Sequence, residues 1–418
     1  MVRKLNLNIV NINLKLEFFF PVFSLFLFIN PRSNAQIIQT YDDELNLIDS
    51  GKKIENTISL FTSKSNFETI KNTTRGKVNM KATDLIINGD TLVPDRIDTR
   101  GQTTLLFRRK SYSFSLKSKA SFRHGEKKES FKKFFALSLS MDRNYFNNRM
   151  AFEMMENAYL FDLFYSFCEL RINNQSEGIY MIIERPEDWA IRKKDSPLLI
   201  RRGYNQNIDK TETGKKIGKD EVKKYNIYYR QIYSSLNRYE GEELYKTLSS
   251  RLNVDAYMKW LAFNFFVRNS DYTDEVYLYI DPHINKFNII PWDYDDLFST
   301  APHEGYIESR KLLGDKLIFS AEDVLDQKIA VDPFLYRAYL IQFRELLNQL
   351  SPVVLKRIFE NTYAELYPYY LNDEIINMSR YDLYINANLA KLKNDMISLY
   401  EQLKLSRDLY LKYIESNI

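Results

Sequence analysis

The alternation of apolar and polar residues predicts strands in the first half of the chain. Residues 110–117 alternate almost perfectly, with the aromatic and leucine side chains on one face and the serines on the other. This period of two is typical of a half-buried strand. Asn88 and Gly89 predict a tight hairpin, because both residue types accept the positive φ angles of a type I′ turn. Further strands are predicted at 164–172, 178–184 and 198–201, the first two joined by a loop at 173–175.

A spacing of three to four between apolar residues predicts helices elsewhere. Residues 147–160 and 254–268 follow it, and after about residue 225 the chain is mostly helical. The last helical segment repeats apolar residues at Leu389, Leu392, Met396, Leu399 and Leu403. This repeat is too short to argue a coiled-coil seam, so core packing is favoured. The lysine-rich segment 205–224 predicts a loop or linker.

Strands first, with one helix among them, and helices second predict an α+β fold in two lobes. We expect a strand-rich N-lobe over 36–210 and a helical C-lobe over 211–418 that carries an acidic site. The length of 418 residues allows this division, at roughly 150 residues per domain. A cleft between two lobes is a usual place for a ligand.

The first 35 residues differ from the rest. Arg3, Lys4 and Lys15 precede an apolar run at 18–29, and small residues follow at 33–35. This order predicts a signal peptide at 1–35, with a buried N-terminal strand or helix as the alternative. The run is shorter than the roughly 20 residues of a membrane span. We therefore expect a secreted, periplasmic or cell-surface protein without a transmembrane segment in the mature chain.

The residue inventory excludes several classes of site. No pair of glycines has the GxG spacing and no GxxxxGK occurs, which removes the dinucleotide fingerprint and the P-loop. Three histidines and one cysteine cannot form a His- or Cys-rich zinc site, so any metal would be held by carboxylates, as Mg²⁺ or Mn²⁺ prefers. Residues 36–418 carry 55 basic and 54 acidic residues. This near-neutral balance gives no support to a nucleic-acid partner.

Two acidic segments flank a predicted pair of short strands at 276–280 and 287–290. They contain Asp271, Asp274, Glu275, Asp293, Asp295 and Asp296. If the strands pair as a hairpin, both segments lie at its same open end. Crowded carboxylates repel one another unless a cation lies among them. The alternative is two acidic loops in solvent, but apolar neighbours such as Trp292 favour a partly buried site.

Such a cluster suits phosphoryl transfer. That reaction needs an aspartate beside the attacking hydroxyl, carboxylates on Mg²⁺ and a lysine on the phosphates. Protein kinases place the first aspartate in a loop and the metal-binding one after a short hairpin, and the spacing from Asp271 to Asp293 fits this order. Lys110, at the head of the 110–117 strand, is a candidate lysine. The alternative is a solvated lysine at a strand end.

Short segments spread over about 200 residues together resemble one known family. They are Arg100-Gly101-Gln102-Thr103, Arg109-Lys110-Ser111-Tyr112, Leu137 with Asp142 and Asn148-Arg149, Leu170 to Asn174 with Glu177 to Tyr180 and Glu184, Asn269-x-Asp271, and Pro291-Trp292-Asp293-x-Asp295. In this order the segments resemble the CotH kinase family of atypical protein kinases, which are secreted or surface-associated.

The resemblance implies a protein-kinase-like fold and ATP-dependent phosphorylation of serine in proteins, with Mg²⁺ or Mn²⁺. Asp271 matches the catalytic aspartate of the family, and Asp293 matches its metal-binding aspartate. Asp295 is expected as a further metal ligand. Lys110 would approach the ATP phosphates. Glu184 would lie near the nucleotide pocket, and either Glu184 or Glu153 would pair with Lys110.

Two departures from the family pattern bear on activity. Val276 stands where the family often has a second metal-binding asparagine, which would put Glu275 in that role. Gln102 and Thr103 replace the family serine after Arg-Gly. A non-catalytic protein that binds nucleotide or a partner on the same scaffold is therefore the second hypothesis. A glycosidase is the third, and is disfavoured because its two carboxylates must face each other across a groove. Metal-dependent nucleotide binding would distinguish the first two from the third.

Overall fold

The computed structural model describes residues 44–49, 51–142, 144–215, 217–273, 276–379 and 387–418. Asp42–Ile418 forms one compact unit. The predicted signal peptide at 1–35 lies outside the described residues, and so does Glu275. None of the helices in the described ranges is both long and apolar enough to cross a membrane.

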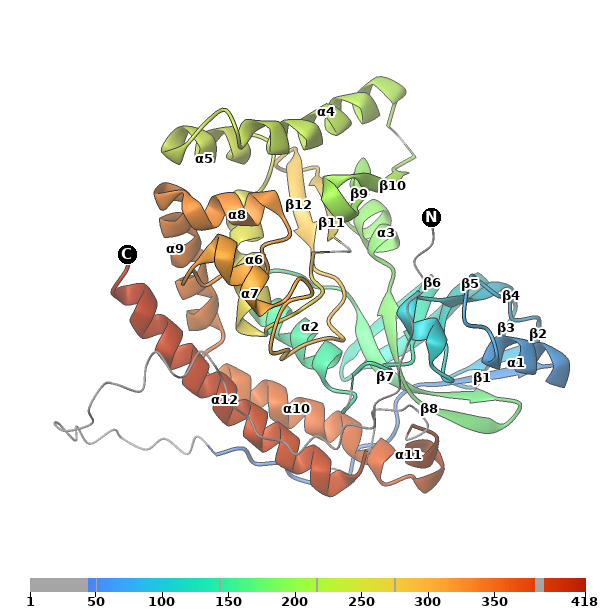
Figure 1. The fold of residues 1–418 in the computed structure, drawn as a ribbon. Coiled ribbons are helices and arrows are strands. Elements are labelled where there is room, and N and C mark those ends of the chain that lie inside the picture. Colours follow the sequence, from blue (N-terminus) through green and yellow to red (C-terminus); the bar gives the residue numbers. More distant parts are fainter. Residues whose placement is uncertain (1–43, 50, 143, 216, 274–275, 380–386) are drawn as a thin grey trace, which may run out of the picture. The chain divides into compact units, whose positions relative to one another are not determined.

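A large mixed sheet occupies the first part of the unit (Figure 1). Its strands are β1 (Thr57–Thr62), β2 (Ala82–Ile87), β3 (Asp90–Leu92), β4 (Pro94–Arg100), β5 (Ser111–His124), β6 (Lys127–Leu137), β7 (Tyr165–Ile172) and β8 (Gln175–Glu184). They lie in the order β3-β2-β1-β7-β8-β6-β5-β4. Strands β1 and β7 are parallel, and the other neighbours are antiparallel. Helix α1 (Lys64–Lys71) follows β1.

The local patterns predicted several of these strands but not β6. The hairpin at Asn88 and Gly89 is confirmed, with φ angles of 52° and 89°. The strand at 110–117 is confirmed as the first part of β5, and its alternate side chains are buried. Strand β8 begins earlier than predicted, because Asn173 and Asn174 complete the turn after β7 with φ angles of 51° and 66°.

A second sheet has four antiparallel strands in the order β10-β9-β11-β12. They are β9 (Leu198–Arg202), β10 (Ile208–Thr213), β11 (Val276–Asp281) and β12 (Lys286–Ile290). The predicted strand at 198–201 and the predicted hairpin at 276–290 are thereby confirmed. The lobe boundary near residue 210 stays a prediction, and this sheet contains strands from both sides of it.

The prediction of a loop at 205–224 is wrong. The segment contains the edge strand β10 and the start of helix α4 (Lys219–Ser235). The polar residues of β10 alternate between half-buried and exposed positions. Helix α4 buries Tyr225, Tyr229 and Ile232 on one face. Its lysines lie mostly on the other face, so the lysine-rich composition concealed an amphipathic helix.

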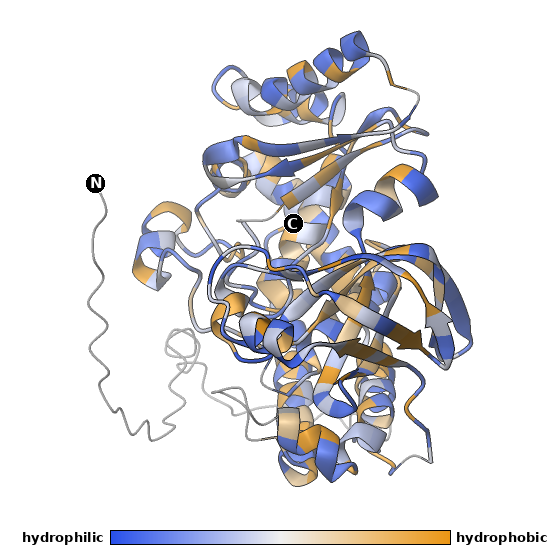
Figure 2. Cartoon of the chain, turned by 90° about the vertical axis from the view of Figure 1, so that its right-hand side faces the viewer, coloured by the Kyte–Doolittle hydropathy of each residue, from blue (hydrophilic) through white to orange (hydrophobic). Residues whose placement is uncertain are grey.

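The remaining helices contribute many residues of the larger hydrophobic core. They are α2 (Asn147–Asn157), α3 (Pro186–Asp188), α5 (Gly241–Ser249), α6 (Val254–Phe266), α7 (Tyr306–Leu313), α8 (Val324–Val331), α9 (Pro333–Gln349), α10 (Pro352–Tyr370), α11 (Asp373–Ser379) and α12 (Leu389–Glu415). The predicted helices at 147–160 and 254–268 are confirmed as α2 and α6. Along the ribbons, apolar and polar residues alternate (Figure 2).

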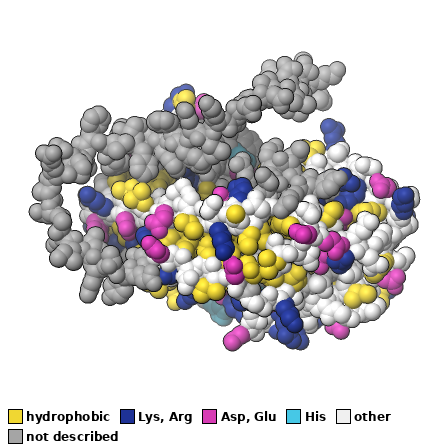
Figure 3. Space-filling view, turned by 90° about the horizontal axis from the view of Figure 1, so that it is seen from below, with side chains coloured by type: hydrophobic (Ala, Val, Ile, Leu, Met, Phe, Trp, Pro, Cys, Tyr) yellow, Lys and Arg dark blue, Asp and Glu magenta, His cyan; other side chains and the backbone are white. Residues whose placement is uncertain are grey.

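The packing of helix α12 shows the structural role of the C-terminal leucine repeat. It packs on α9 and α10, and its buried residues include Leu392, Met396 and Leu403. Core packing is therefore confirmed as the use of this stripe. Exposed apolar side chains remain on the same helices, among them Val353 and Leu405. On the face seen in Figure 3, hydrophobic side chains are interspersed with charged side chains of both signs.

Candidate functional site

A cavity of about 890 Å³ brings the acidic segments together with the large sheet. Its walls come from the loop after β4, from β5 and β6, from α2, from the end of β8 and from β9 and β10. The acidic lining includes Asp271, Asp293, Asp295 and Asp296. This volume lies in the range of pockets that enclose a small ligand.

The hairpin and a buried asparagine together bring the two acidic segments side by side. Strands β11 and β12 pair with Tyr277 opposite Ile290, so the segments meet at the open end of the hairpin, as predicted. The fully buried Asn269 donates from Nδ2 to the carbonyl oxygen of Asp293 at 3.0 Å. Its Oδ1 accepts from the backbone N–H of Asp271 at 3.1 Å. One amide side chain thus fixes both aspartates relative to each other.

Asp293 and Asp295 form a half-buried carboxylate pair. Burial raises the pKa of Asp293, although the charges of Arg100 and Arg201 oppose the rise. Burial and the charge of Asp293 raise the pKa of Asp295 well above its usual range. The backbone of Asp293 has a φ of 63°, a left-handed conformation that side chains larger than glycine seldom adopt. Such strain is typical of functional sites.

This pair fits a hard divalent cation. Magnesium is commonly held by one or two carboxylates together with substrate phosphates. In the ranges that the structure describes, no group of three or more His, Cys, Asp or Glu side chains could enclose a metal by itself. A cation there would therefore depend on further oxygens, from phosphate or from residues outside those ranges, such as Glu275. The two half-buried aspartates would lose their mutual repulsion when it binds.

Three arginines line the cavity, Arg100, Arg185 and Arg201, and the sequence had assigned a role to none of them. The guanidinium carbon of Arg100 lies 4.1 Å from the centroid of the Phe135 ring and 5.9 Å from that of Trp292. Arg100 ends β4, and Gly101 then turns the chain with a φ of 98°. A Cβ at Gly101 would lie 1.9 Å from Thr104 Oγ1, so the turn requires glycine. The Arg-Gly pair in the family-like segment was the available signal.

Lys110 lies directly before β5, at the head of the predicted strand, and its contact with ATP phosphates stays a prediction. It is 1% exposed, so the alternative of a solvated strand-end lysine is wrong. Its Nζ donates to the carbonyl oxygens of Thr73 at 2.8 Å, Leu105 at 2.7 Å and Phe107 at 2.5 Å. Lys110 does not line the cavity. It instead stabilises the loop around the short helix Thr103–Leu106.

The two glutamates considered as partners of Lys110 have other partners. Glu153 pairs with Arg149 and accepts from Asn361 Nδ2 at 3.1 Å. Glu184 is buried in β8, 3.9 Å from Lys193 Nζ, and burial raises its pKa to about 7. Its neighbours Ile183 and Arg185 line the cavity, but Glu184 does not.

Two further titratable residues lie near the acidic segments, and the sequence had assigned a role to neither of them. Asp142 is fully buried ahead of α2, where its Oδ2 accepts from Asn148 N at 3.2 Å, and burial raises its pKa to about 7. The charge of Asp142 also contributes to the raised pKa of Asp295. His303 lies with its Nδ1 3.1 Å from Asp271 Oδ1. The contact between His303 and Asp271 is not visible in the sequence, because the β11–β12 hairpin separates these two residues along the chain.

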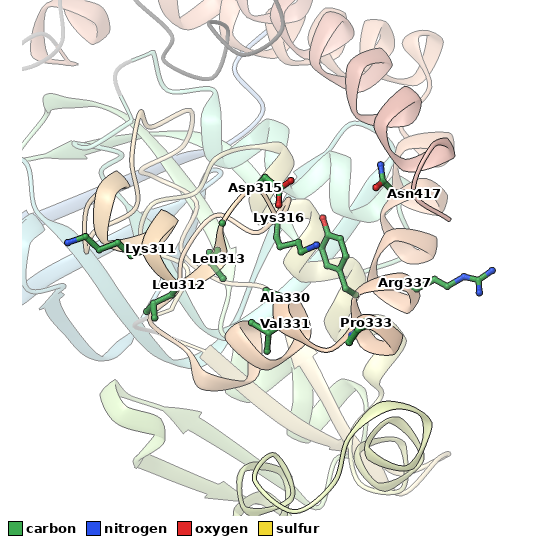
Figure 4. A pocket seen from close by; sticks show the side chains of 12 residues that line it. Lys311, Leu312, Leu313, Asp315, Lys316, Ala330, Val331, Pro333, Arg337 and Asn417 are labelled. Carbon is green, nitrogen blue, oxygen red and sulfur yellow. The ribbon is translucent and has the colours of Figure 1, made fainter.

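A second cavity, of about 600 Å³, lies between α7, α8, the start of α9 and the C-terminal end of the chain (Figure 4). Lys316 Nζ lies 4.4 Å from the centroid of the Tyr336 ring. Lys311 and Arg337 point in opposite directions (Figure 4). The charged side chains of this second cavity therefore do not converge on one point, in contrast to the carboxylates of the first cavity.

Comparisons with known proteins confirm the resemblance to the CotH kinase family. A model of the CotH kinase protein family matches residues 97–394. The inner spore coat protein H of Bacillus subtilis (strain 168) is 20% identical over 350 residues, which cover 80% of this chain and 88% of that protein.

Among solved structures, a chain from the complex of the HipA and HipB toxin–antitoxin system with its operator DNA, from Shewanella oneidensis MR-1, matches with 12% identity. The match covers 71% of this chain and 64% of that chain, which is less than two thirds of the latter, and its TM-score of 0.28 carries no argument about the fold. The family model, in contrast, spans more than half of the chain. The chain therefore belongs to the CotH kinase protein family and is kinase-like.

Proposed function

We propose that this protein is a secreted, periplasmic or cell-surface kinase that transfers the γ-phosphate of ATP to serine residues of a protein, with Mg²⁺ or Mn²⁺. The observation that carries the proposal is the cavity in which Asn269 joins Asp271 to Asp293. The location rests on the leader pattern and on the spore-coat relative. The two-lobed arrangement is part of the same proposal.

In this mechanism Asp271 orients the acceptor serine and takes its hydroxyl proton. The serine oxygen forms a bond to the γ-phosphorus, the bond from that phosphorus to the bridging oxygen breaks, and ADP leaves. Asp293 and Asp295 would hold the cation, and Glu275 would be its third carboxylate. The cation supplies charge neutralisation on the phosphates. Most of the acceleration in such transfers comes from positioning and fixed charge.

The second candidate is a non-catalytic protein that binds nucleotide or a partner on the same scaffold. Val276 in place of the family asparagine favours it, and so does the engagement of Lys110 with backbone carbonyls. The half-buried pair Asp293 and Asp295 disfavours it, since a cavity without a cation gains nothing from two repelling carboxylates.

The test is label transfer by the full chain from γ-labelled ATP to a serine-rich protein, first with Mg²⁺ and then with Mn²⁺. We expect transfer that stops without metal and in Asp271→Asn. A melting-temperature increase with ATP and metal, without transfer to any acceptor, would instead support the nucleotide-binding scaffold. No transfer and no stabilisation would refute both.

Methionine substitutions at Arg100 and at Lys110 distinguish the roles of these two residues. We expect Arg100→Met to raise the KM for ATP at least about tenfold, because the variant loses one charge-assisted contact with ATP. The melting temperature should change little. We expect Lys110→Met to lower the free energy of unfolding by about 3 kcal/mol, because buried carbonyls lose a charged donor. Its folded fraction should keep the wild-type KM. A raised KM for ATP in Lys110→Met, with an unchanged KM in Arg100→Met, would instead assign the phosphate contact to Lys110.

A further inference from the structure

The segment that follows the acidic residues runs alongside the segment that leads to Asp271. Phe298 N donates to Val267 O at 2.9 Å, and Ser299 N donates to Arg268 O at 3.1 Å. A little further on, His303 N donates to Ser270 O at 3.2 Å. His303 therefore has its backbone attached to the residue directly before Asp271.

The other side of His303 is anchored as well. Glu304 accepts from Ser320 Oγ at 3.0 Å and from Ala321 N at 2.6 Å. Gly305 N donates to Pro302 O at 2.9 Å, which closes a turn around the histidine. Because bonds on both sides fix the backbone, His303 is not an arbitrary surface side chain.

The imidazole of His303 lies in the cavity against two carboxylates. Its Nδ1 is 3.1 Å from Asp271 Oδ1, and its Nε2 is 3.9 Å from Asp296 Oδ2. The side chain is 44% exposed, so solvent reaches the ring. Asp296 is itself fixed, since its carbonyl oxygen accepts from Ser270 N at 3.2 Å and its carboxylate accepts from Ser270 Oγ.

We propose that His303 is a positioning residue for Asp271. A proton on Nδ1, 3.1 Å from Asp271 Oδ1, would let the ring donate to this oxygen and fix the rotation of the carboxylate. A carboxylate with one orientation presents the same oxygen to each incoming hydroxyl, and misplacement of a reacting group is costly in rate. The inference rests on the proposed function, since it assigns to Asp271 the role of orienting the acceptor.

The competing interpretation is an ordinary exposed contact between a histidine and an aspartate. Such pairs contribute little to stability and nothing to rate. The two interpretations differ in which substitutions restore the function. An asparagine can place its Nδ2 donor close to the position of the histidine Nδ1, whereas a glutamine places its donor near Nε2. A surface contact would not distinguish these two side chains.

The kinetic test compares His303→Leu, His303→Asn and His303→Gln in the full chain. We expect His303→Leu to lower kcat about 10- to 100-fold with the KM for ATP within twofold. We expect His303→Asn to recover to within about threefold of wild type and His303→Gln to stay low. His283→Leu is the matched control, on the exposed turn between β11 and β12, and should keep wild-type kinetics. Wild-type kcat in His303→Leu, or equal loss in His303→Asn, would overturn the inference.

A second measurement does not depend on turnover. The chain has three histidines, so nitrogen-15 spectra of its imidazoles are simple to assign. We expect His303 to carry a proton on Nδ1 and to lose that preference in Asp271→Ala. An unchanged ring in Asp271→Ala would overturn the contact. If the ring behaves as expected but the wild-type chain transfers no phosphate, the proposed function fails, and with it the role of His303 in transfer.

Discussion

Asp293→Asn is expected to abolish phosphoryl transfer, with kcat/KM reduced at least about 10³-fold, a loss at the upper end for one fixed electrostatic group. Asp293 lies in the cavity beside Asp271, and its backbone holds the left-handed φ of 63° through the bond to Asn269. The substitution retains the shape of the side chain and removes the charge that would hold the cation. The measurement is transfer from γ-labelled ATP at saturating Mg²⁺.

The same variant should remain folded. Asp293 and Asp295 lie side by side at half-buried positions, and desolvation raises the pKa of both. A neutral amide beside Asp295 relieves their repulsion, so the metal-free melting temperature should be equal to or above that of the wild type. The melting-temperature increase with ATP and Mg²⁺ should disappear.

The control is Asp281→Asn, at the turn end of the same hairpin, where Asp281 Oδ1 accepts from His283 N at 2.9 Å. It removes one carboxylate from the hairpin and leaves the cavity unchanged, so transfer should stay at the wild-type rate. Full transfer by Asp293→Asn would contradict the assignment of this aspartate and would mean that other residues hold the metal.

The acidic site could be predicted because its determinants are local. The segments around Asp271 and Asp293 are joined by one short hairpin, and the strand patterns on either side fix where they meet. The hairpin register then follows from the alternation of buried residues. Carboxylates gathered at the end of such a hairpin are visible in the sequence itself.

The cationic half of the site could not be predicted in this way. Lys110 meets the carbonyl of Thr73 across 37 residues of sequence, and no local pattern indicates that contact. Arg100 stacks on Phe135 and Trp292, which come from β6 and from the second acidic segment. A lysine at the head of a strand resembles a phosphate ligand in sequence whether it is buried or free. Only the three-dimensional arrangement shows that Arg100 lines the cavity and that Lys110 does not.

Replacement of Arg149 by methionine is expected to cause the largest loss of stability, about 3–5 kcal/mol, the usual result of leaving a buried charge without its partner. Arg149 lies on α2 and is fully buried. Its Nη2 donates to Glu365 Oε1 of α10 at 2.7 Å, and its Nε donates to Glu365 Oε2 at 3.0 Å. Urea unfolding measures the change. Lys246→Met, in the exposed pair with Glu242 on α5, is the control and should cost under about 0.5 kcal/mol.

The pH dependence of stability gives an independent check on this ion pair. Burial alone would raise the pKa of Glu365, but the charges of Arg149 and His124 outweigh it and hold the pKa well below its usual range. A carboxylate with a lowered pKa in the folded state stabilises the fold above its unfolded pKa of about 4.3, and that contribution is lost as the pH falls below it. The difference in unfolding free energy between the wild type and Arg149→Met should therefore shrink from pH 7 towards pH 3. A difference that stays constant over this range would mean that packing of the arginine side chain, and not its charge, joins α2 to α10.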